Sequence, residues 1–339
     1  MANPIGSVEA SATTVNHLYP ELDAAVVNAF DIHKNTDKPP WVMNLFRRVD
    51  VKGAYVSEHA WGGAPSPLPL NRGQYLHEAG FGEYTLTLYV EDYGTPVMWF
   101  HINDIQDSRA PKSMVDRAND SGTMLAQNEE FVLQELLTQT ATTFLHEDTD
   151  FTTIFGSTGL FNDSHSFNSQ SLDNSLAISG VSAANFGNDL WTARQTFREM
   201  VDDQGRPYWN RNRISGMKWL LVLPPELEKI ASTILRSDLV VPAGATAPAS
   251  NIVKDVFGKN VEPEIFEWLT DASEWFCFLA SEDADGMRPY LLGDRKGIEQ
   301  KVWNMSQSDR SRATHQEGRQ WWRRIVFGMG IPQTALRFT

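Results

Sequence analysis

One long helical segment constrains the fold of this chain more than any other feature. The stretch "KSMVDRANDSGTMLAQNEEFVLQELLTQTATTFL", residues 112–145, has a stripe of apolar side chains at helical spacing. The stripe consists of Val132, Leu133, Leu136, Leu137, Thr140, Ala141 and Leu145. At about 1.5 Å per residue, such a helix is roughly 50 Å long, well above the globular average. With start signals at Ser108 and Pro111 we expect it over about 109–146, packed on a sheet or core, with Gly122 as a candidate kink.

The composition is that of an acidic globular chain. It has 339 residues, of which 41% are hydrophobic, enough for one large domain or two ordinary ones with a sizeable core. The formal net charge is −14, so its field repels nucleic-acid phosphates and anionic membrane surfaces. The single cysteine, Cys277, excludes an intramolecular disulfide and is expected to be an inert core residue.

The chain shows no sign of secretion or of membrane insertion. Its N-terminus lacks the basic start and continuous apolar core of a signal peptide. The longest apolar runs, "WLLVL" from Trp219 and "WFCFLA" from Trp275, fall far short of the roughly 20 residues that a membrane-spanning helix needs. We therefore expect a cytoplasmic product that does not cross a bilayer.

A long hairpin is predicted before the helix. The first forty or so residues are rich in small and polar types and are expected to form an arm. From Arg47 a strand leads into a tip dense in Gly and Pro, and the returning strand alternates apolar and polar residues through Tyr84, Leu86 and Leu88. Loops as long as this tip usually have an external role, and reaching a neighbouring molecule is one.

The second half has the pattern of an α+β domain. The stretch "SAANFGNDLWTARQTFREMVDDQGRPYW" predicts a helix that ends near Gly205, and "GMKWLLVLPPELEKIASTILRS" predicts a buried strand followed by an amphipathic helix. Short strands are expected at "PEIFEWL", "WFCFLAS" and "RPYLLGDRKG", and the aromatic C-terminal stretch is β-like.

The sequence carries no recognised catalytic or cofactor motif. It has no P-loop, dinucleotide fingerprint, nucleophile elbow or zinc spacing. In "FNDSHSFN" the residues Asp163, Ser164 and His165 are adjacent, whereas hydrolytic triads are assembled from distant segments. We interpret this stretch as a polar surface loop.

Two acidic clusters are also poor metal sites. "HEDTD" begins at His146, and "EDADG" begins at Glu282. A calcium loop needs glycine sixth and a carboxylate twelfth, but placing Gly286 sixth puts Leu292 twelfth. We interpret the clusters as a helix exit and a hairpin turn, and expect no catalytic residue, no cofactor and no metal.

Two groups of aromatic and basic residues invite a nucleic-acid interpretation. Arg206, Arg211 and Arg213 lie near Tyr208 and Trp209 in the sequence, a combination typical of single-strand binding. Against a net charge of −14, we interpret the three arginines as intersubunit charge partners. A second group is Trp321, Trp322, Arg323 and Arg324, which we interpret as a strand near a domain seam.

The order of several stretches resembles one family. These are "FGEYTLTLYVEDYGTPVMWFHIND" before the long helix, "GLFNDSHSFN", the helix that follows, "VLPPELE", "WFCFLAS" through "RPYLL", and "GRQWWRRIVFG" near the end. Over residues 40–339 this order is similar to that of the major capsid proteins of tailed bacteriophages, which have the Hong Kong 97-type fold, and among them to the Mu-like major head subunits.

The resemblance implies an α+β fold in five segments. They are an N-terminal arm (1–46), an extended β-hairpin loop (47–92), a peripheral domain (93–181) with the spine helix at about 109–146, an axial domain (182–315), and a C-terminal strand (316–339) that returns to the seam between the two domains. The hairpin would lie over a neighbouring subunit, and the axial domain would surround five-fold and six-fold centres.

The implied function is structural. The chain would assemble with itself, as pentamers and hexamers, into an icosahedral virion shell that encloses double-stranded DNA without binding it specifically. Assembly would take place in the host cytoplasm with a portal, a separate scaffolding protein and in some cases a decoration protein, and without a membrane. The alternatives are an encapsulin-type compartment shell and a soluble carbohydrate-binding or carbohydrate-active protein, the latter suggested by the 11 tryptophans.

Two departures from relatives in this family refine the expectation. Only about forty residues precede the hairpin, so any scaffold would be a separate protein. No lysine occurs between Lys52 and Lys112, so no lysine cross-link is expected from the loop tip. The expected intersubunit contacts are Trp61, Arg72, Gln74, Tyr75, Arg206, Arg211 and Arg213.

Overall fold

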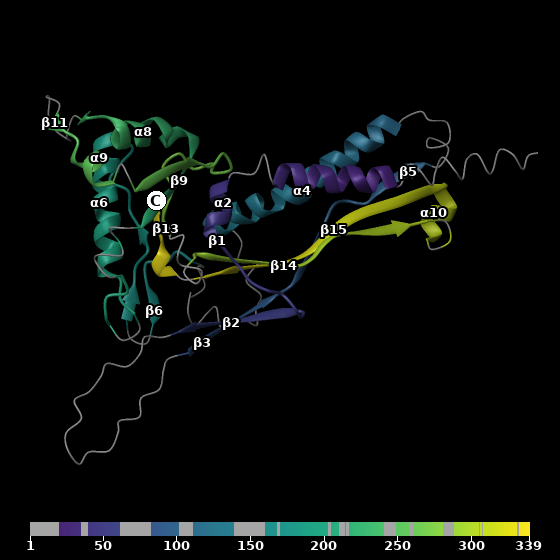
Figure 1. Ribbon diagram of the computed structural model, residues 1–339, viewed down its shortest axis with the longest axis horizontal. Helices are drawn as coiled ribbons and strands as arrows, with labels where there is room; N and C mark the ends of the chain where they lie inside the picture. Colours follow the sequence, from purple (N-terminus) through teal and green to yellow (C-terminus); the bar gives the residue numbers. More distant parts are fainter. Residues whose placement is uncertain are drawn as a thin grey trace, which may run out of the picture.

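The computed structural model has an elongated lobe and a compact lobe joined side by side (Figure 1). It describes residues 20–34, 40–61, 83–101, 111–138, 160–167, 170–202, 205–209, 214, 217–240, 249–257, 260–280, 288–304, 306, 308–330 and 332–339. Within these ranges, no helix is both long enough and apolar enough to cross a membrane.

The predicted long helix is the backbone of the elongated lobe. Helix α4 runs over Pro111–Thr138, and residues 139–146 of the predicted helix lie outside the described residues. Its 28 residues give a length of about 42 Å. One side of the helix is fully covered, since Val132, Leu133 and Leu137 are 0% exposed. The predicted apolar stripe is confirmed over this part of the helix.

A five-stranded sheet accompanies this helix. Its order is β1-β14-β15-β4, and β5 also pairs with β15. The strands are β1 Phe46–Arg48, β4 Glu91–Gly94, β5 Met98–His101, β14 Tyr290–Trp303 and β15 Gln316–Met329. Strands β14 and β15 form a long antiparallel ribbon with the short helix α10, Asp309–Thr314, at its outer end (Figure 1).

The prediction of a short strand at "RPYLLGDRKG" is wrong, because β14 is 14 residues long. The register of the β14–β15 pair shifts between Asp294 and Lys296 and again between Lys296 and Glu299. Such bulges break the period-two alternation that marks a strand in a sequence. Strand β14 and helix α10 lie with β15 in the elongated lobe (Figure 1), and the bounds of the expected axial domain, 182–315, stay a prediction.

The compact lobe is a second five-stranded sheet with helices beside it. The strand order is β12-β9-β13-β16-β8. The strands are β8 Ser175–Leu176, β9 Lys218–Leu223, β12 Val261–Ile265, β13 Trp275–Ala280 and β16 Ala335–Phe338. The helical elements are α6 Ala183–Glu199, the 3₁₀ turn η3 Pro225–Leu227, α8 Glu228–Arg236, α9 Ile252–Phe257 and the 3₁₀ turn η4 Pro332–Thr334.

The centre of this sheet is an apolar core. From Trp219 to Leu223, β9 is buried without interruption, which is the pattern of a strand covered on both faces. On β13, Trp275 stacks on Phe338 of β16 with ring centroids 4.1 Å apart. Cys277 is buried in the same strand, and burial raises the pKa of its thiol well above the usual value. The prediction of a core cysteine is therefore confirmed.

The remaining strands form two-stranded hairpins. They are β2 Tyr55–Trp61 with β3 Glu83–Tyr89, β6 His165–Phe167 with β7 Gln170–Leu172, and β10 Leu239–Val240 with β11 Ala249–Ser250. The β2–β3 pair runs from Tyr55 opposite Tyr89 to Trp61 opposite Glu83, which confirms a hairpin here. Its first strand begins at Tyr55 and not at Arg47 as predicted, because Phe46–Arg48 form β1 and pair with β14. The loop between them, residues 62–82, lies outside the described residues.

Part of the predicted N-terminal arm is a helix packed on α4. Residues 20–34 are helical, and α2, Pro40–Leu45, follows them. The side chains of Leu22 and Val26 are completely buried in a small core with Met114 and Ala118 of α4. This part of the chain therefore completes the elongated lobe (Figure 1).

Gly122 is the point of closest approach between the two helices. A Cβ atom at this position would lie 2.3 Å from the carbonyl oxygen of Val26 and 3.0 Å from the Cβ atom of Ala29. The 2.3 Å distance to a backbone atom is shorter than any relaxed contact, so only glycine fits here without a shift of the helices. Close packing of the two helices therefore accounts for the glycine at position 122, which the sequence offered as a candidate kink.

Polar contacts hold both ends of the 20–34 helix. Near its start, Asp23 accepts hydrogen bonds from the indole of Trp321, at 3.0 Å, and from the amide of Gln300. Near its end, the imidazole of His33 lies 3.5 Å from the carboxylate of Glu130, and both side chains are buried. The helix is therefore fixed to the β14–β15 ribbon at one end and to α4 at the other.

Arg323 joins the elements of the elongated lobe. Its side chain is 2% exposed, and Nη2 lies 3.1 Å from Glu129 Oε1 on α4 and 2.6 Å from Asp294 Oδ1 on β14. Nη1 donates to the carbonyl of Leu125, and the guanidinium lies 5.0 Å from the ring centroid of Phe30 on the 20–34 helix. A buried charge is tolerated only when it is paired and hydrogen-bonded, so this arrangement requires all four elements to be in place.

Replacing Arg323 with methionine is expected to lower the free energy of unfolding by about 3–5 kcal/mol, because the buried Glu129 would lose its ion pair with Arg323. The neighbouring Arg324 is the matched control, since its pair with Asp92 lies at the surface and R324M should stay close to the wild type. Urea denaturation of the unassembled chain measures both. Equal losses in the two variants would contradict the role given to Arg323.

Replacing Gly122 with alanine should destabilise the chain by roughly 1–3 kcal/mol, because the added methyl group pushes the 20–34 helix away. In an unobstructed helix the same change stabilises by about 1 kcal/mol, so the sign is diagnostic. Asp120→Ala, an exposed change on the same helix, should stay within about 0.5 kcal/mol of the wild type. Stabilisation by G122A would show that the two helices do not touch here.

Candidate assembly surfaces

The part of the chain that the structure describes presents two projecting surfaces (Figure 1). In the part of the chain that the structure describes, no group of three or more His, Cys, Asp or Glu side chains is arranged to hold a metal ion. The β2–β3 hairpin and the end of the compact lobe at β11 both project from the body (Figure 1).

The β2–β3 hairpin leaves the body on a firm base. Leu88 is 4% exposed and lies over Gly328 of β15, where an added Cβ atom would come within 2.4 Å of the leucine. Beyond this base, β2 and β3 pair with each other in a sheet of their own. An isolated two-stranded hairpin is marginally stable in water, so contact with another molecule would stabilise it.

Most of the predicted contact residues of this hairpin cannot be placed. Trp61 is the last residue of β2, opposite Glu83 on β3, and its side chain lies outside the described residues. Arg72, Gln74 and Tyr75 also lie outside them. Their contacts with a neighbouring subunit remain predictions.

Arg206 has a partner within its own chain. Its guanidinium donates to Asp202 through Nε at 3.0 Å and Nη2 at 2.8 Å, and its backbone N–H donates to the same carboxylate. Arg211 and Arg213 lie outside the described residues. An intersubunit role for the three arginines thus stays a prediction. In such a contact, Arg206 would bind a carboxylate of a second copy while it remains paired with Asp202.

The aromatic residues beside Arg206 do not form a stacking platform. Trp209 is 2% exposed, and its indole N–H donates to the carbonyl of Gln333 at 2.8 Å. Tyr208 packs edge-on against it, with ring centroids 5.0 Å apart. Single-stranded nucleic acid needs exposed rings for its bases, so Trp209 is a structural anchor between this turn and η4.

The predicted polar loop around His165 is confirmed only in part. Asp163 and Ser164 are exposed, but His165 is 1% exposed and its Nε2 lies 2.9 Å from the carbonyl oxygen of Leu160. The side-chain amide of Asn174 donates to the same carbonyl at 2.8 Å. His165 was placed at the surface by its polar neighbours, but as the first residue of a short strand it points inward and supports the loop.

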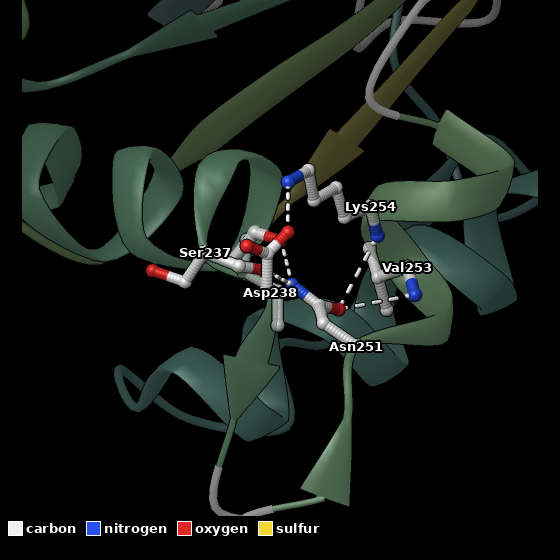
Figure 2. A network of polar contacts seen from close by, with 6 residues as sticks. Ser237, Asp238, Asn251, Val253 and Lys254 are labelled. Atoms are coloured by element: carbon white, nitrogen blue, oxygen red, sulfur yellow. Dashed lines mark hydrogen bonds and ion pairs between the residues drawn. The ribbon is translucent and has the colours of Figure 1, made fainter.

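At the end of the compact lobe, one buried amide joins two helices. Nδ2 of Asn251 donates to the carbonyls of Ile234, at 2.6 Å, and Ser237, at 2.8 Å, where α8 ends. Its Oδ1 accepts from the backbone N–H groups of Val253, at 3.1 Å, and Lys254, at 3.2 Å, where α9 begins (Figure 2). Asn251 therefore caps the C-terminal end of one helix and the N-terminal end of the next.

An ion pair and two apolar side chains surround this joint. Asp238 pairs with Lys254, and this hydrogen bond lowers the pKa of the exposed carboxyl below its usual value. Leu239 and Ile252 are 59% and 63% exposed. The rigid joint thus presents two large apolar side chains to solvent at the projecting end of the lobe (Figure 1).

This surface was missed in the sequence, where "DLVVPAGATAPASNIVKDVFG" was interpreted as a loop of small residues. One signal was present, because an asparagine directly before "IVKDVF" is a typical N-cap. The exposure of Leu239 and Ile252 left no such signal, because β10 and α9, with 2 and 6 residues, are too short to show a clear period.

Replacing Asn251 with alanine is expected to cost roughly 1–3 kcal/mol of folding free energy, since it leaves buried backbone groups of both helices without partners. Thermal and urea unfolding of the unassembled chain measure the loss. Lys229→Ala, on the exposed side of α8, is the control and should change stability by less than about 0.5 kcal/mol. A neutral N251A would contradict the capping role.

Comparison with known proteins gives matches in structure and none in sequence. No known protein-family profile matches the chain, and no curated protein is similar to it in sequence. The mature capsid of bacteriophage PhiM1 is similar in fold, with a TM-score of 0.54 and 11% identity over 89% of this chain and 87% of that chain. The capsid of a native GTA particle gives 0.53 and 11% over 88% of each chain. A virus-like particle from Pyrococcus furiosus gives 0.50 and 11% over 93% of this chain and 97% of that chain.

Proposed function

We propose, from the Hong Kong 97-type fold of this chain, that it is the major capsid protein of a tailed phage or prophage and assembles into an icosahedral head that encloses double-stranded DNA. The observation that carries the proposal is the correspondence over nearly the whole length with the PhiM1 capsid, 89% of this chain and 87% of that one. A single shared motif would align only a part of the two chains, whereas this match includes both lobes.

The shape of the molecule supports this function. An elongated lobe, a compact lobe and a projecting hairpin give the subunit an extended shape with a large surface for its mass (Figure 1). Such a subunit can bury more surface against its neighbours than a compact domain of the same mass. A closed shell needs contacts between different faces of the same chain, and projecting elements at separate points of the outline can supply them.

The proposed partners follow from the same reasoning. Copies of the chain would form pentamers and hexamers, with a portal, a separate scaffolding protein and in some cases a decoration protein, during assembly in the host cytoplasm. The net charge of −14 suits a wall that should not hold the enclosed DNA. We propose no catalytic role, since the polar groups followed above, such as Asn251 and His165, make structural hydrogen bonds.

Two alternatives are less well supported. An encapsulin-type compartment shell would share the fold, and it would enclose protein cargo instead of DNA. A soluble carbohydrate-binding protein would use exposed aromatic rings, but five of the tryptophans are at most 4% exposed: Trp41, Trp209, Trp219, Trp275 and Trp321. Packing in the core accounts for these rings more simply.

The full chain is expected to form closed particles or rings of five and six copies. Deletion of residues 65–80, at the tip of the hairpin, should leave a folded chain that cannot close shells, because its reach to the neighbour is lost. Size-exclusion chromatography with light scattering and negative-stain microscopy compares the two, and circular dichroism checks that the shortened chain is folded.

Two results would count against this account. Normal heads from the shortened chain would remove the assembly role of the hairpin. A full-length chain that stays monomeric under every condition, including co-expression with its neighbouring reading frames, would contradict the capsid function and direct attention to a glycan screen. The nucleic-acid or protein content of purified particles separates a phage head from a cargo compartment.

A further inference from the structure

The outer end of the elongated lobe carries a cluster that the fold alone does not explain. The end of β14, helix α10, strand β5 and the beginning of β15 meet there, at the greatest distance from the compact lobe (Figure 1). We call the side chains of Trp99, Lys301, Trp303 and Arg310 at this end the peripheral tip.

Two tryptophan rings form the base of the peripheral tip. The ring centroids of Trp99 and Trp303 are 6.3 Å apart, with an angle of 41° between the planes. Trp99 lies directly against β15, where a Cβ atom at Gly318 would come within 2.9 Å of its ring. Glycine at this position therefore lets the ring lie on the strand.

A cation lies over each ring. The Cζ atom of Arg310 is 4.3 Å from the ring centroid of Trp99, and Nζ of Lys301 is 5.1 Å from that of Trp303. Both basic side chains are exposed. A cation–π contact fixes the position of a cation while its N–H groups stay available to an acceptor.

These two cations have no carboxylate partner among the residues that the structure describes. Among the described residues, neither Lys301 nor Arg310 has an ion pair, whereas Arg323, Arg324 and Arg337 all do. Acidic side chains outnumber basic ones by 43 to 29 in the chain, so unmatched cations are unexpected.

The sequence segment that carries Lys301 and Arg310 has the opposite charge balance to the rest of the chain. Residues 301–319 contain four basic and two acidic side chains. The remainder of the chain holds 41 of the 43 acidic and 25 of the 29 basic ones. A second copy of the chain therefore offers a surface that is acidic on average, and such complementarity guides association and orientation.

We propose that the peripheral tip docks on an acidic surface of a second copy, with Lys301 and Arg310 each contacting a carboxylate of that copy. This inference rests on the proposed shell function and identifies one of its contacts. The two rings hold the cations in place before docking, so that less side-chain entropy is lost when the contact forms.

Zero-length carbodiimide cross-linking tests the contact directly, because it joins an amine to a carboxylate only when the two touch. Particles are assembled from equal parts of ¹⁵N-labelled and unlabelled chain, cross-linked and analysed by mass spectrometry. Lys301 should be linked to an Asp or Glu of a differently labelled copy in particles and not in unassembled chain. Lys52, which lies 3.2 Å from Asp50 of its own chain, should give links within one copy and serves as the control.

Charge reversal gives a second test. The variant K301E/R310E should lower the yield of particles by about tenfold at low salt and make it less sensitive to added NaCl. The control K229E/R236E makes the same change in net charge on exposed positions of α8 and should assemble more completely. Unchanged thermal unfolding of both variants shows that the fold is intact.

The outcomes separate this inference from the proposed function. If the wild-type chain assembles and K301E/R310E assembles equally well, or if K229E/R236E fails to the same degree, the tip contact is wrong and the capsid function stands. If Lys301 is linked only within its own copy, the tip contact is also wrong. If K301E/R310E assembles normally but loses binding to a fluorescent DNA duplex, the partner is nucleic acid. A wild-type chain that does not assemble overturns the function itself.

Discussion

The burial of Arg323 is the constraint on which the elongated lobe depends. One guanidinium, 2% exposed, meets Glu129 on α4 and Asp294 on β14, and it lies beside Phe30 on the 20–34 helix. Leaving any of these elements out would expose or isolate a buried charge, which costs several kcal/mol. The lobe therefore forms as one unit, and Gly122 allows its two helices to approach closely enough to close around that charge.

An elongated lobe that forms as one unit suits a shell subunit, because it fixes the distance between the surfaces at its two ends. The hairpin base at Leu88 lies on β15, and the peripheral tip lies at the other end of the same ribbon. In the proposed shell, contacts with neighbouring copies would be held at separate points of this one ribbon. In the compact lobe, Asn251 performs a similar task on a smaller scale, since it fixes the projecting end by capping two helices at once.

The elements with a simple period could be predicted from the sequence, and the tertiary contacts could not. Helix α4, strand β3 and buried β9 were expected because each has an unbroken pattern over its length. The full length of β14 was hidden by two register shifts, and the inward position of His165 by its polar neighbours. The pairing of Arg323 with Glu129 joins residues 194 positions apart, which no local pattern encodes. The predicted contacts of Arg72 and Tyr75 remain untested by the structure.

Electron cryo-microscopy of the particles formed by the full-length chain tests the central claim most directly. The account predicts a closed shell one chain thick, in which the elongated lobes tile the wall and each 55–89 hairpin lies against a neighbouring copy. A chain that stays monomeric, or a particle in which the hairpins touch no other copy, would contradict it.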